Sequence, residues 1–393
     1  MSKVIYMDNA ATTFVDKRVL DAMTPYLTDK CFNPSSIYDG AQDVHADLDN
    51  AREIIAKTLN ANAREIFFTS CGTESDNWAI KGVARANADK GKHLITSKIE
   101  HHAVLHSMES LEKEGFSVTY LDVDSNGLVN PDELEKAIRP DTILVSIMYA
   151  NNEIGTIEPI KKLADICHKH NVYFHVDAVQ AYAHIPIDVS SDGMDLLSAS
   201  GHKFNAMKGT GFLYIKKGTK ISNFMDGGAQ EFKKRAGTEN VAAIIGMAKA
   251  VEIAFAEMDN RIKNETEIRD YMIDRILDEI PYSKLNGDRT LRLPNNVNIG
   301  FEFIEGESML LALNDIGVYA SSGSACTSGS LDPSHVLLAI GLPHAKAHGS
   351  LRLSISHNNT MEEAKFVCDN LLKIVERLRA MSPLYEDFVN NKK

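Results

Sequence analysis

The chain is organised around one run of residues, Leu196-Leu197-Ser198-Ala199-Ser200-Gly201-His202-Lys203-Phe204, which leads on to Lys208-Gly209-Thr210-Gly211-Phe212-Leu213-Tyr214. The first run passes from an apolar pair through small hydroxylated residues to a His-Lys pair, and the second is a glycine-flanked entry into another apolar segment. This pattern predicts a lysine held at a tight turn between two strands. A single lysine is ordinarily a solvated surface charge, so its meaning depends on its surroundings.

A carboxylate precedes this lysine by 26 residues, at the end of the segment Val172-Tyr173-Phe174-His175-Val176-Asp177. That segment has the pattern of an apolar strand, and open α/β sheets bind their ligands at the carboxyl ends of their strands. A lysine that can form a Schiff base and an aspartate that can pair with a pyridinium nitrogen are what pyridoxal phosphate (PLP) chemistry requires. Lys203 and Asp177 therefore point to a PLP site.

Length and composition favour a soluble globular protein of two domains. The chain has 393 residues, and this length is more than one hydrophobic core usually organises. Of these residues 44% are hydrophobic and 24% are charged, as is typical of soluble globular proteins. Neither a membrane-length apolar run nor a secretory leader pattern is present, so we expect a cytoplasmic protein with no membrane partner. The net charge of −12 disfavours nucleic-acid binding. Five scattered cysteines without a C-x-x-C spacing argue against a disulfide framework or a cysteine-rich zinc site.

Strand patterns and helix patterns alternate along the first two thirds of the chain. Repeated βα units predict a mostly parallel sheet with helices on both faces. We predict a large domain over residues 14–259, and a smaller α+β domain built from residues 1–13 and 260–393. The boundary is expected near Asp259-Asn260, between one helix ending at about Met258 and another beginning at about Arg261.

Residues 65–75 have the pattern of a strand, a glycine turn and the start of a helix, with Gly72 at the turn. Such an arrangement suits a phosphate, because unpaired N–H groups and the helix dipole are directed at one spot. Cys71 is interpreted as a small buried residue rather than a nucleophile. The neighbouring pair His101 and His102 begins another helix, and adjacent helical side chains do not face each other, which disfavours a shared metal ion.

A second cysteine has a different setting. The run Ser321-Ser322-Gly323-Ser324-Ala325-Cys326-Thr327-Ser328-Gly329-Ser330 is small, polar and glycine-rich. This composition is typical of a mobile loop rather than packed structure, and a free cysteine there is expected to present an exposed thiol.

Four motifs together resemble the cysteine desulfurases of the NifS/IscS type. They are Asp177-Ala178-Val179-Gln180, Ser200-Gly201-His202-Lys203, Arg235-Ala236-Gly237-Thr238-Glu239-Asn240 and the Cys326 run, and the match extends from Tyr6 to about Thr360. The resemblance implies the fold type I of PLP-dependent transferases, within the class V aminotransferase-like enzymes. The long form of the Cys326 loop resembles group I of the family.

The resemblance also implies a role for each matching residue. Lys203 would hold the cofactor and act as base, His101 would stack on the ring and shuttle protons, and Asp177 would keep the ring nitrogen protonated. The remaining cofactor contacts would be Gly72, Thr73, Ser200 and His202 at the phosphate, Asn152 and Gln180 at the phenolic oxygen, and Thr238 reaching the phosphate of the other subunit of a homodimer. Arg352, with Asn152, would bind the substrate carboxylate.

The implied reaction converts L-cysteine to L-alanine and leaves a persulfide on Cys326, for transfer to an acceptor such as an iron-sulfur scaffold. No resident metal is expected, and a transient iron–sulfur contact of Cys326 is left open. A selenocysteine lyase, a PLP aminotransferase and a catalytically silent docking partner in sulfur transfer are the alternatives. Four positions depart from the family pattern: Tyr38, Ala206-Met207, Phe232-Lys233-Lys234 and Ser356-His357.

Overall fold

The computed structural model describes residues 4–322 and 333–391. Its largest element is a sheet with the strand order β2-β8-β7-β6-β5-β3-β4. All neighbouring pairs in it are parallel except those of β8, which is antiparallel to both β2 and β7. The strands are β2 (Ile66–Thr69), β3 (His93–Ser97), β4 (Ser117–Leu121), β5 (Thr142–Ser146), β6 (Tyr173–Asp177), β7 (Leu196–Ser200) and β8 (Gly211–Ile215). The predicted mostly parallel sheet is confirmed.

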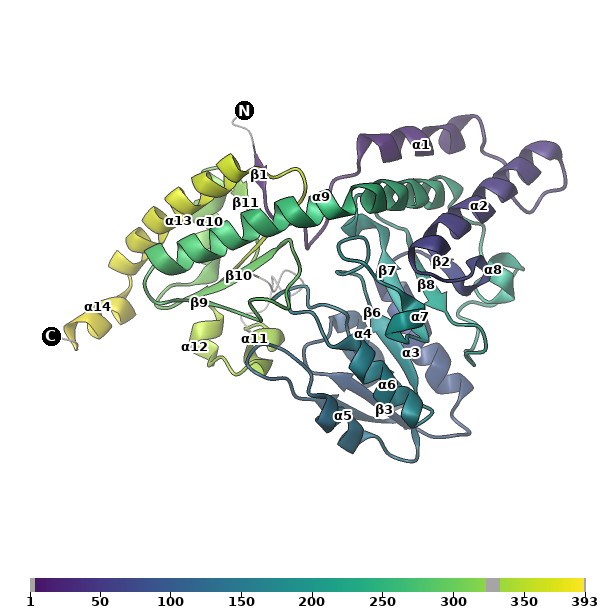
Figure 1. The fold of residues 1–393 in the computed structure, drawn as a ribbon, viewed down its shortest axis with the longest axis horizontal. Coiled ribbons are helices and arrows are strands. Elements are labelled where there is room, and N and C mark those ends of the chain that lie inside the picture. Colours follow the sequence, from purple (N-terminus) through teal and green to yellow (C-terminus); the bar gives the residue numbers. More distant parts are fainter. Residues whose placement is uncertain (1–3, 323–332, 392–393) are drawn as a thin grey trace.

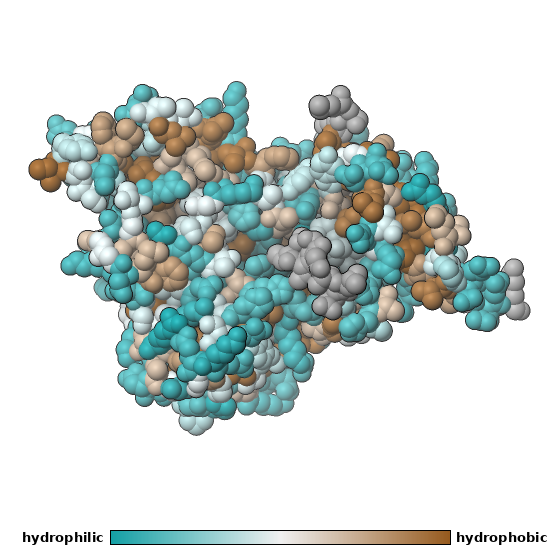
Figure 2. Space-filling view, turned by 180° about the vertical axis from the view of Figure 1, so that it is seen from behind, coloured by the Kyte–Doolittle hydropathy of each residue, from teal (hydrophilic) through white to brown (hydrophobic). Residues whose placement is uncertain are grey.

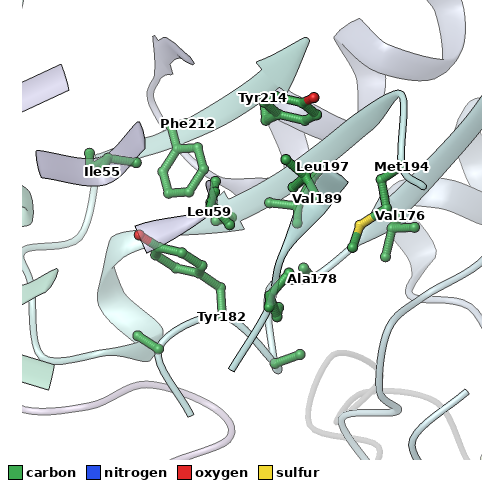
Figure 3. Close-up of a cluster of buried hydrophobic side chains, with 14 of the residues drawn as sticks. Ile55, Leu59, Val176, Ala178, Tyr182, Val189, Met194, Leu197, Phe212 and Tyr214 are labelled. Carbon is green, nitrogen blue, oxygen red and sulfur yellow. The ribbon is translucent and has the colours of Figure 1, made fainter. Parts of the chain in front are cut away.

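Helices cover both faces of this sheet, because alternate side chains along each strand enter different cores. Leu197 on β7 belongs to the core formed with α2 and α9, whereas Leu196 belongs to the core formed with α3 and α4. Figure 3 shows part of the first core, with Tyr182 and Phe212 facing Leu59 of the α2 side. The helices are α1 (Lys17–Thr28), α2 (Asp39–Thr58), α3 (Gly72–Ala86), α4 (His102–Lys113), α5 (Pro131–Ala137), α6 (Ile160–Lys169), α7 (Val189–Asp192) and α8 (Gln230–Lys233).

A second hydrophobic core lies around two smaller sheets. One pairs β1 and β11 in parallel, and the other has the antiparallel order β12-β10-β9. Apolar side chains from both ends of the chain fill this core, including Met7 and Leu371. Its elements, with the short helices near it, are β1 (Ile5–Tyr6), β9 (Ser283–Leu285), β10 (Asn296–Phe301), α10 (Gly306–Asp315), β11 (Val318–Tyr319), α11 (His335–Ala339), α12 (His344–Ala347), β12 (Ser350–Ser354), α13 (Met361–Ala380) and α14 (Pro383–Asn390).

One long helix, α9 (Val241–Glu279), joins the two cores and corrects a prediction. It runs without a break through Asp259 and Asn260, where the sequence had suggested a boundary between two helices. Both residues are exposed polar positions on a helix that is buried on its other side, so polarity there marks a solvated face. Figure 1 shows α9 crossing from α1 and α2 to α13. The division at residues 14 and 260 stays a prediction.

Candidate active site

A cavity of about 560 Å³ lies where the carboxyl ends of β6 and β7 meet residues from the second core. It is lined by most of the residues that the sequence singled out: Gly72, Thr73, His101, Asn152, Asp177, Gln180, Ser200, His202, Lys203 and Arg352. These positions are spread over 281 residues of sequence, from 72 to 352 counted inclusively. The fold therefore brings ten predicted site residues into one cavity.

Lys203 ends a single 3₁₀ turn, Gly201–Lys203, that follows β7. The predicted tight turn before the next strand is confirmed. The Lys203 Nζ donates to the carbonyl oxygens of Ala10 (2.6 Å) and Ala11 (2.9 Å), and the Lys203 carbonyl oxygen lies 3.0 Å from His184 Nε2. These contacts hold the amine inside the cavity rather than in solvent.

Asp177 is the last residue of β6 and is buried. Its Oδ1 accepts a hydrogen bond from the Val179 N–H at 2.9 Å. Burial raises the pKa of Asp177 above its ordinary value, although the Val179 N–H and the charge of Lys203 act in the opposite direction. Gln180, three residues later, donates from Nε2 to the Ala10 carbonyl at 2.9 Å. A buried carboxylate near a lysine can pair with a cationic ring nitrogen.

The other end of the cavity has the features of a phosphate site. Gly72 and Thr73 begin α3, whose N-terminal N–H groups favour an anion. A Cβ at Gly72 would lie 2.6 Å from Val179 Cγ2, so only glycine fits this approach without movement. The Ser200 Oγ is buried without a hydrogen-bond partner among the described residues, and an unpaired buried hydroxyl is costly unless a ligand completes it. His202 also lines the cavity, with its Nδ1 at 3.1 Å from Thr12 Oγ1.

His101 caps the N-terminus of α4, and its Nδ1 accepts from the Ala103 N–H at 3.1 Å. Burial, followed by the nearby charge of Lys203, lowers the pKa of His101 to about 4. The ring is therefore neutral near pH 7. Because Nδ1 is an acceptor, the proton lies on Nε2.

Another part of the cavity wall is formed by Arg352 of β12, which belongs to the second core. Arg352 is 2% exposed and forms an ion pair with Asp8 at 2.8 Å, and its Nη1 donates to the Asn152 carbonyl at 3.0 Å. Its Nε is buried without a hydrogen-bond partner among the residues described. A guanidinium that is held on two sides and desolvated is suited to a carboxylate ligand.

Three further positions that the sequence analysis named need separate comment. Cys326 lies outside the described residues. Thr238 is exposed and is not a lining residue. Cys71 was expected to be buried, which is wrong: it is partly exposed and lines the cavity, because it is the residue immediately before α3 and its side chain makes no capping bond.

Sequence reasoning missed other lining residues, notably Asp76, Glu153, Ser334 and His335. Asp76 follows Gly72 by four residues on α3, so helical spacing alone could have placed it on the same face. Glu153 adjoins Asn152, and its Oε2 accepts from the Ser334 Oγ at 2.6 Å. Burial raises the pKa of Glu153 to about 7. Nothing in the sequence near Glu153 signals its burial.

Within residues 4–322 and 333–391, histidine, cysteine and acidic side chains do not gather in a group of three that could hold a metal ion. The same part of the chain contains no helix with both the length and the apolarity that a membrane crossing needs.

Comparison with known proteins agrees with this geometry. The model of the family described as Aminotransferase class-V matches residues 5–367. The chain belongs to the class-V aminotransferase family. It is 58% identical to the cysteine desulfurase IscS of Methanosarcina thermophila over 98% of this chain and 95% of that protein, and 54% identical to the cysteine desulfurase IscS of Clostridium botulinum (strain Hall) over 100% and 99%.

Two solved structures resemble this class-V chain closely. A NifS-like protein superposes with a TM-score of 0.90 at 38% identity, covering 96% of this chain and 100% of the other. A structure of SspA in complex with cysteine superposes with a TM-score of 0.80 at 38% identity, covering 89% and 98%. Class-V aminotransferases are PLP-dependent, so the cofactor predicted from Lys203 and Asp177 is confirmed.

Proposed function

We propose that the protein is a PLP-dependent cysteine desulfurase that converts L-cysteine to L-alanine and transfers the sulfur to Cys326. The observation that carries this proposal is the meeting of Lys203, Asp177 and Arg352 in one cavity. An amine, a carboxylate for a ring nitrogen and a guanidinium for a carboxylate are the groups that an amino-acid substrate and PLP require. The NifS-like and cysteine-bound relatives support the choice of substrate.

The residues present fit PLP. Ser200 Oγ and the start of α3 at Gly72 and Thr73 would bind its phosphate, Asp177 its ring nitrogen, and His101 one ring face. Bound PLP supplies an electron sink for the bonds at the α-carbon of the substrate. The protein would bind the substrate carboxylate with Arg352, take the α-proton with the Lys203 amine, and return protons to carbon from Lys203 and the neutral His101.

The sulfur-transfer step balances in atoms and electrons. The Cys326 thiolate attacks the substrate sulfur, an S–S bond forms, and the substrate C–S bond breaks with its electron pair staying on carbon. Two protons then complete the methyl group and the α-carbon of alanine, and one molecule of L-cysteine and one enzyme thiol give one alanine and one enzyme persulfide. No external reductant is needed.

The described residues on either side of segment 323–332 support a role for Cys326. Ser321 pairs with Arg352 through backbone hydrogen bonds in both directions, and Ser322 accepts from the Ser350 Oγ at 2.8 Å. On the other side, Pro333 and Ser334 line the cavity. The described residues that flank the segment therefore lie beside the proposed carboxylate site on one side and at the cavity wall on the other.

The proposal includes a homodimer in which Thr238 contributes to the other subunit's phosphate site. Thr238 is exposed, and large apolar side chains near it are exposed too: Phe224 (37%), Met225 (44%) and Phe232 (46%). Figure 2 shows apolar residues on the end of the molecule that carries α1 and α2, where Ile37 is 95% exposed. An apolar surface of this kind favours association. A sulfur acceptor such as an iron-sulfur scaffold and a cytoplasmic location stay predictions.

The decisive experiment is to incubate the purified holoprotein with L-cysteine and to identify alanine and the persulfide site by mass spectrometry. We expect equal amounts of alanine and of persulfide on Cys326 in a single turnover. Cys326→Ala should form neither while still binding PLP. Alanine formation from selenocysteine alone in that variant would instead indicate a selenocysteine lyase, and turnover that depends on a keto acid would indicate an aminotransferase.

A further inference from the structure

A fully buried polar cluster lies behind Asp177, on the sheet face that packs against α3. His175 precedes Asp177 by two residues on β6, so both side chains are on one face. Its Nδ1 is 2.8 Å from the Ser146 Oγ on β5, and its Nε2 is 3.0 Å from the Ser198 Oγ on β7. Ser198 is the register partner of Asp177. Asp76 of α3 completes this cluster, with its Oδ1 at 3.7 Å from His175 Nε2.

Asp76 is unusual for an acidic residue. It is 1% exposed, it lines the cavity, and its Oδ1 has no hydrogen-bond partner among the described residues. The groups that face it are Asp177 and Glu100, the Cys71 thiol, the Ser198 hydroxyl and the His175 ring. None of these supplies a positive charge, because burial lowers the pKa of His175 to about 3.

Two carboxyl groups that share a dry site cannot both ionise cheaply. Asp177 has the charge of Lys203 and the Val179 N–H to support its anion. Asp76 has only the Ser198 hydroxyl, and its pKa is raised well above the ordinary value by burial, with the charge of Asp177 as the next cause. The proton of the pair therefore belongs on Asp76.

We propose that Asp76 is a positioning residue for the cofactor, a neutral carboxylic acid on α3 that keeps Asp177 as the charged member of the pair and so fixes the charge facing the cofactor ring nitrogen. The inference depends on the proposed function only for the identity of the cofactor, PLP, and does not depend on the sulfur-transfer step. It separates two buried aspartates by role: Asp177 pairs with the ring, and Asp76 acts through Asp177.

The proposal makes opposite predictions for two substitutions. Asp76→Asn replaces a neutral acid by a neutral amide of the same shape, and should leave the absorption band of the bound cofactor and its pH midpoint unchanged. Asp76→Ala removes the polar neighbour of Asp177 and Ser198, and should weaken PLP binding by roughly tenfold or more. If Asp76 were instead negatively charged, Asp76→Asn would remove that charge from beside Asp177. The pH midpoint of the cofactor band would then fall by more than about one unit.

The experiment is a pH titration of the cofactor band, together with PLP dissociation constants, for the native holoprotein and both variants. Glu158→Gln is the matched control, because Glu158 is also a buried acidic residue, at 3% exposed, and does not line the cavity. A midpoint that moves by one unit or more in Asp76→Asn overturns the proposal, and so does native PLP affinity in Asp76→Ala. If Asp76→Ala does not fold, the pH midpoint of the cofactor band in Asp76→Asn alone decides whether the proposal stands. Because neither readout involves turnover, a protein that binds PLP but releases no sulfur would refute the proposed function and leave this test intact.

Discussion

Replacing Gly72 with alanine tests the phosphate site directly. The new Cβ would lie 2.6 Å from Val179 Cγ2 and 3.4 Å from Ser200 Cβ. Ordinary carbon contacts are about 3.5–4.0 Å, so the closer pair overlaps by about 1 Å. In the free protein Val179 can relieve the overlap by moving into the cavity, whereas bound PLP would block that movement. The overpacking cost of about 1–3 kcal/mol should then appear in binding, as a loss of about five- to 150-fold in PLP affinity.

The measurement is a titration of the cofactor-free protein with PLP, followed by absorbance of the bound cofactor. Gly82→Ala is the matched control on the same helix, because its Cβ would lie 2.7 Å from Ile221 Cγ1 in the core outside the cavity. That control should lower the unfolding temperature but bind PLP within twofold of the native protein. A Gly72→Ala protein with native PLP affinity would refute the phosphate assignment at the start of α3.

Three further predictions each rest on one feature of the structure. Burial raises the pKa of Glu158 to about 8, so between about pH 4.3 and pH 8 the folded protein holds a proton there that the unfolded chain has lost, and the free energy of unfolding falls as pH rises across this window. Glu158→Gln should remove up to about 4 kcal/mol of the fall between pH 5 and 8, measured by denaturant unfolding. The same pH dependence of the free energy of unfolding in both proteins would contradict this. Lys233 has φ +66°, so Lys233→Gly should raise the free energy of unfolding by about 0.5–1 kcal/mol, while Lys234→Gly at φ −105° should lower it. Arg352→Lys should raise the KM for cysteine by about tenfold or more with a smaller change in kcat, and an unchanged KM in steady-state assays would exclude Arg352 from carboxylate binding.

The parts of the site that sequence could predict are those at strand ends. Asp177 and Ser200 each close an apolar run, and the ends of parallel strands meet at one edge of a sheet, so their proximity follows from the βα pattern. Lys203 follows Ser200 through a glycine turn that the sequence displays openly. For Asp177 and Lys203 these predictions needed only local periodicity and one rule of topology, whereas the phosphate contact of Ser200 was implied by the family resemblance.

Burial of charged side chains could not be predicted in the same way. Asp76 and Glu153 are acidic residues in segments whose neighbours vary in exposure, and acidic side chains are usually solvated. They become buried because α3 packs on the sheet face behind Asp177, and because Ser334 and the asparagines of β10 close over Glu153. Such contacts join residues far apart in sequence and leave no periodic signal.

The same limit explains the contacts of the N-terminal residues. Asp8 pairs with Arg352 from the second core, and Ala10 and Ala11 accept from Lys203 at the end of the first sheet. Neither alanine carries a reactive group, so composition gives no hint that their carbonyl oxygens hold the Lys203 amine. Because α9 joins the two cores as one unbroken helix and this short segment contacts the key cation of each, the cavity depends on both cores being in place at once. Its geometry is therefore a property of the whole chain, and neither sheet alone contains a complete site.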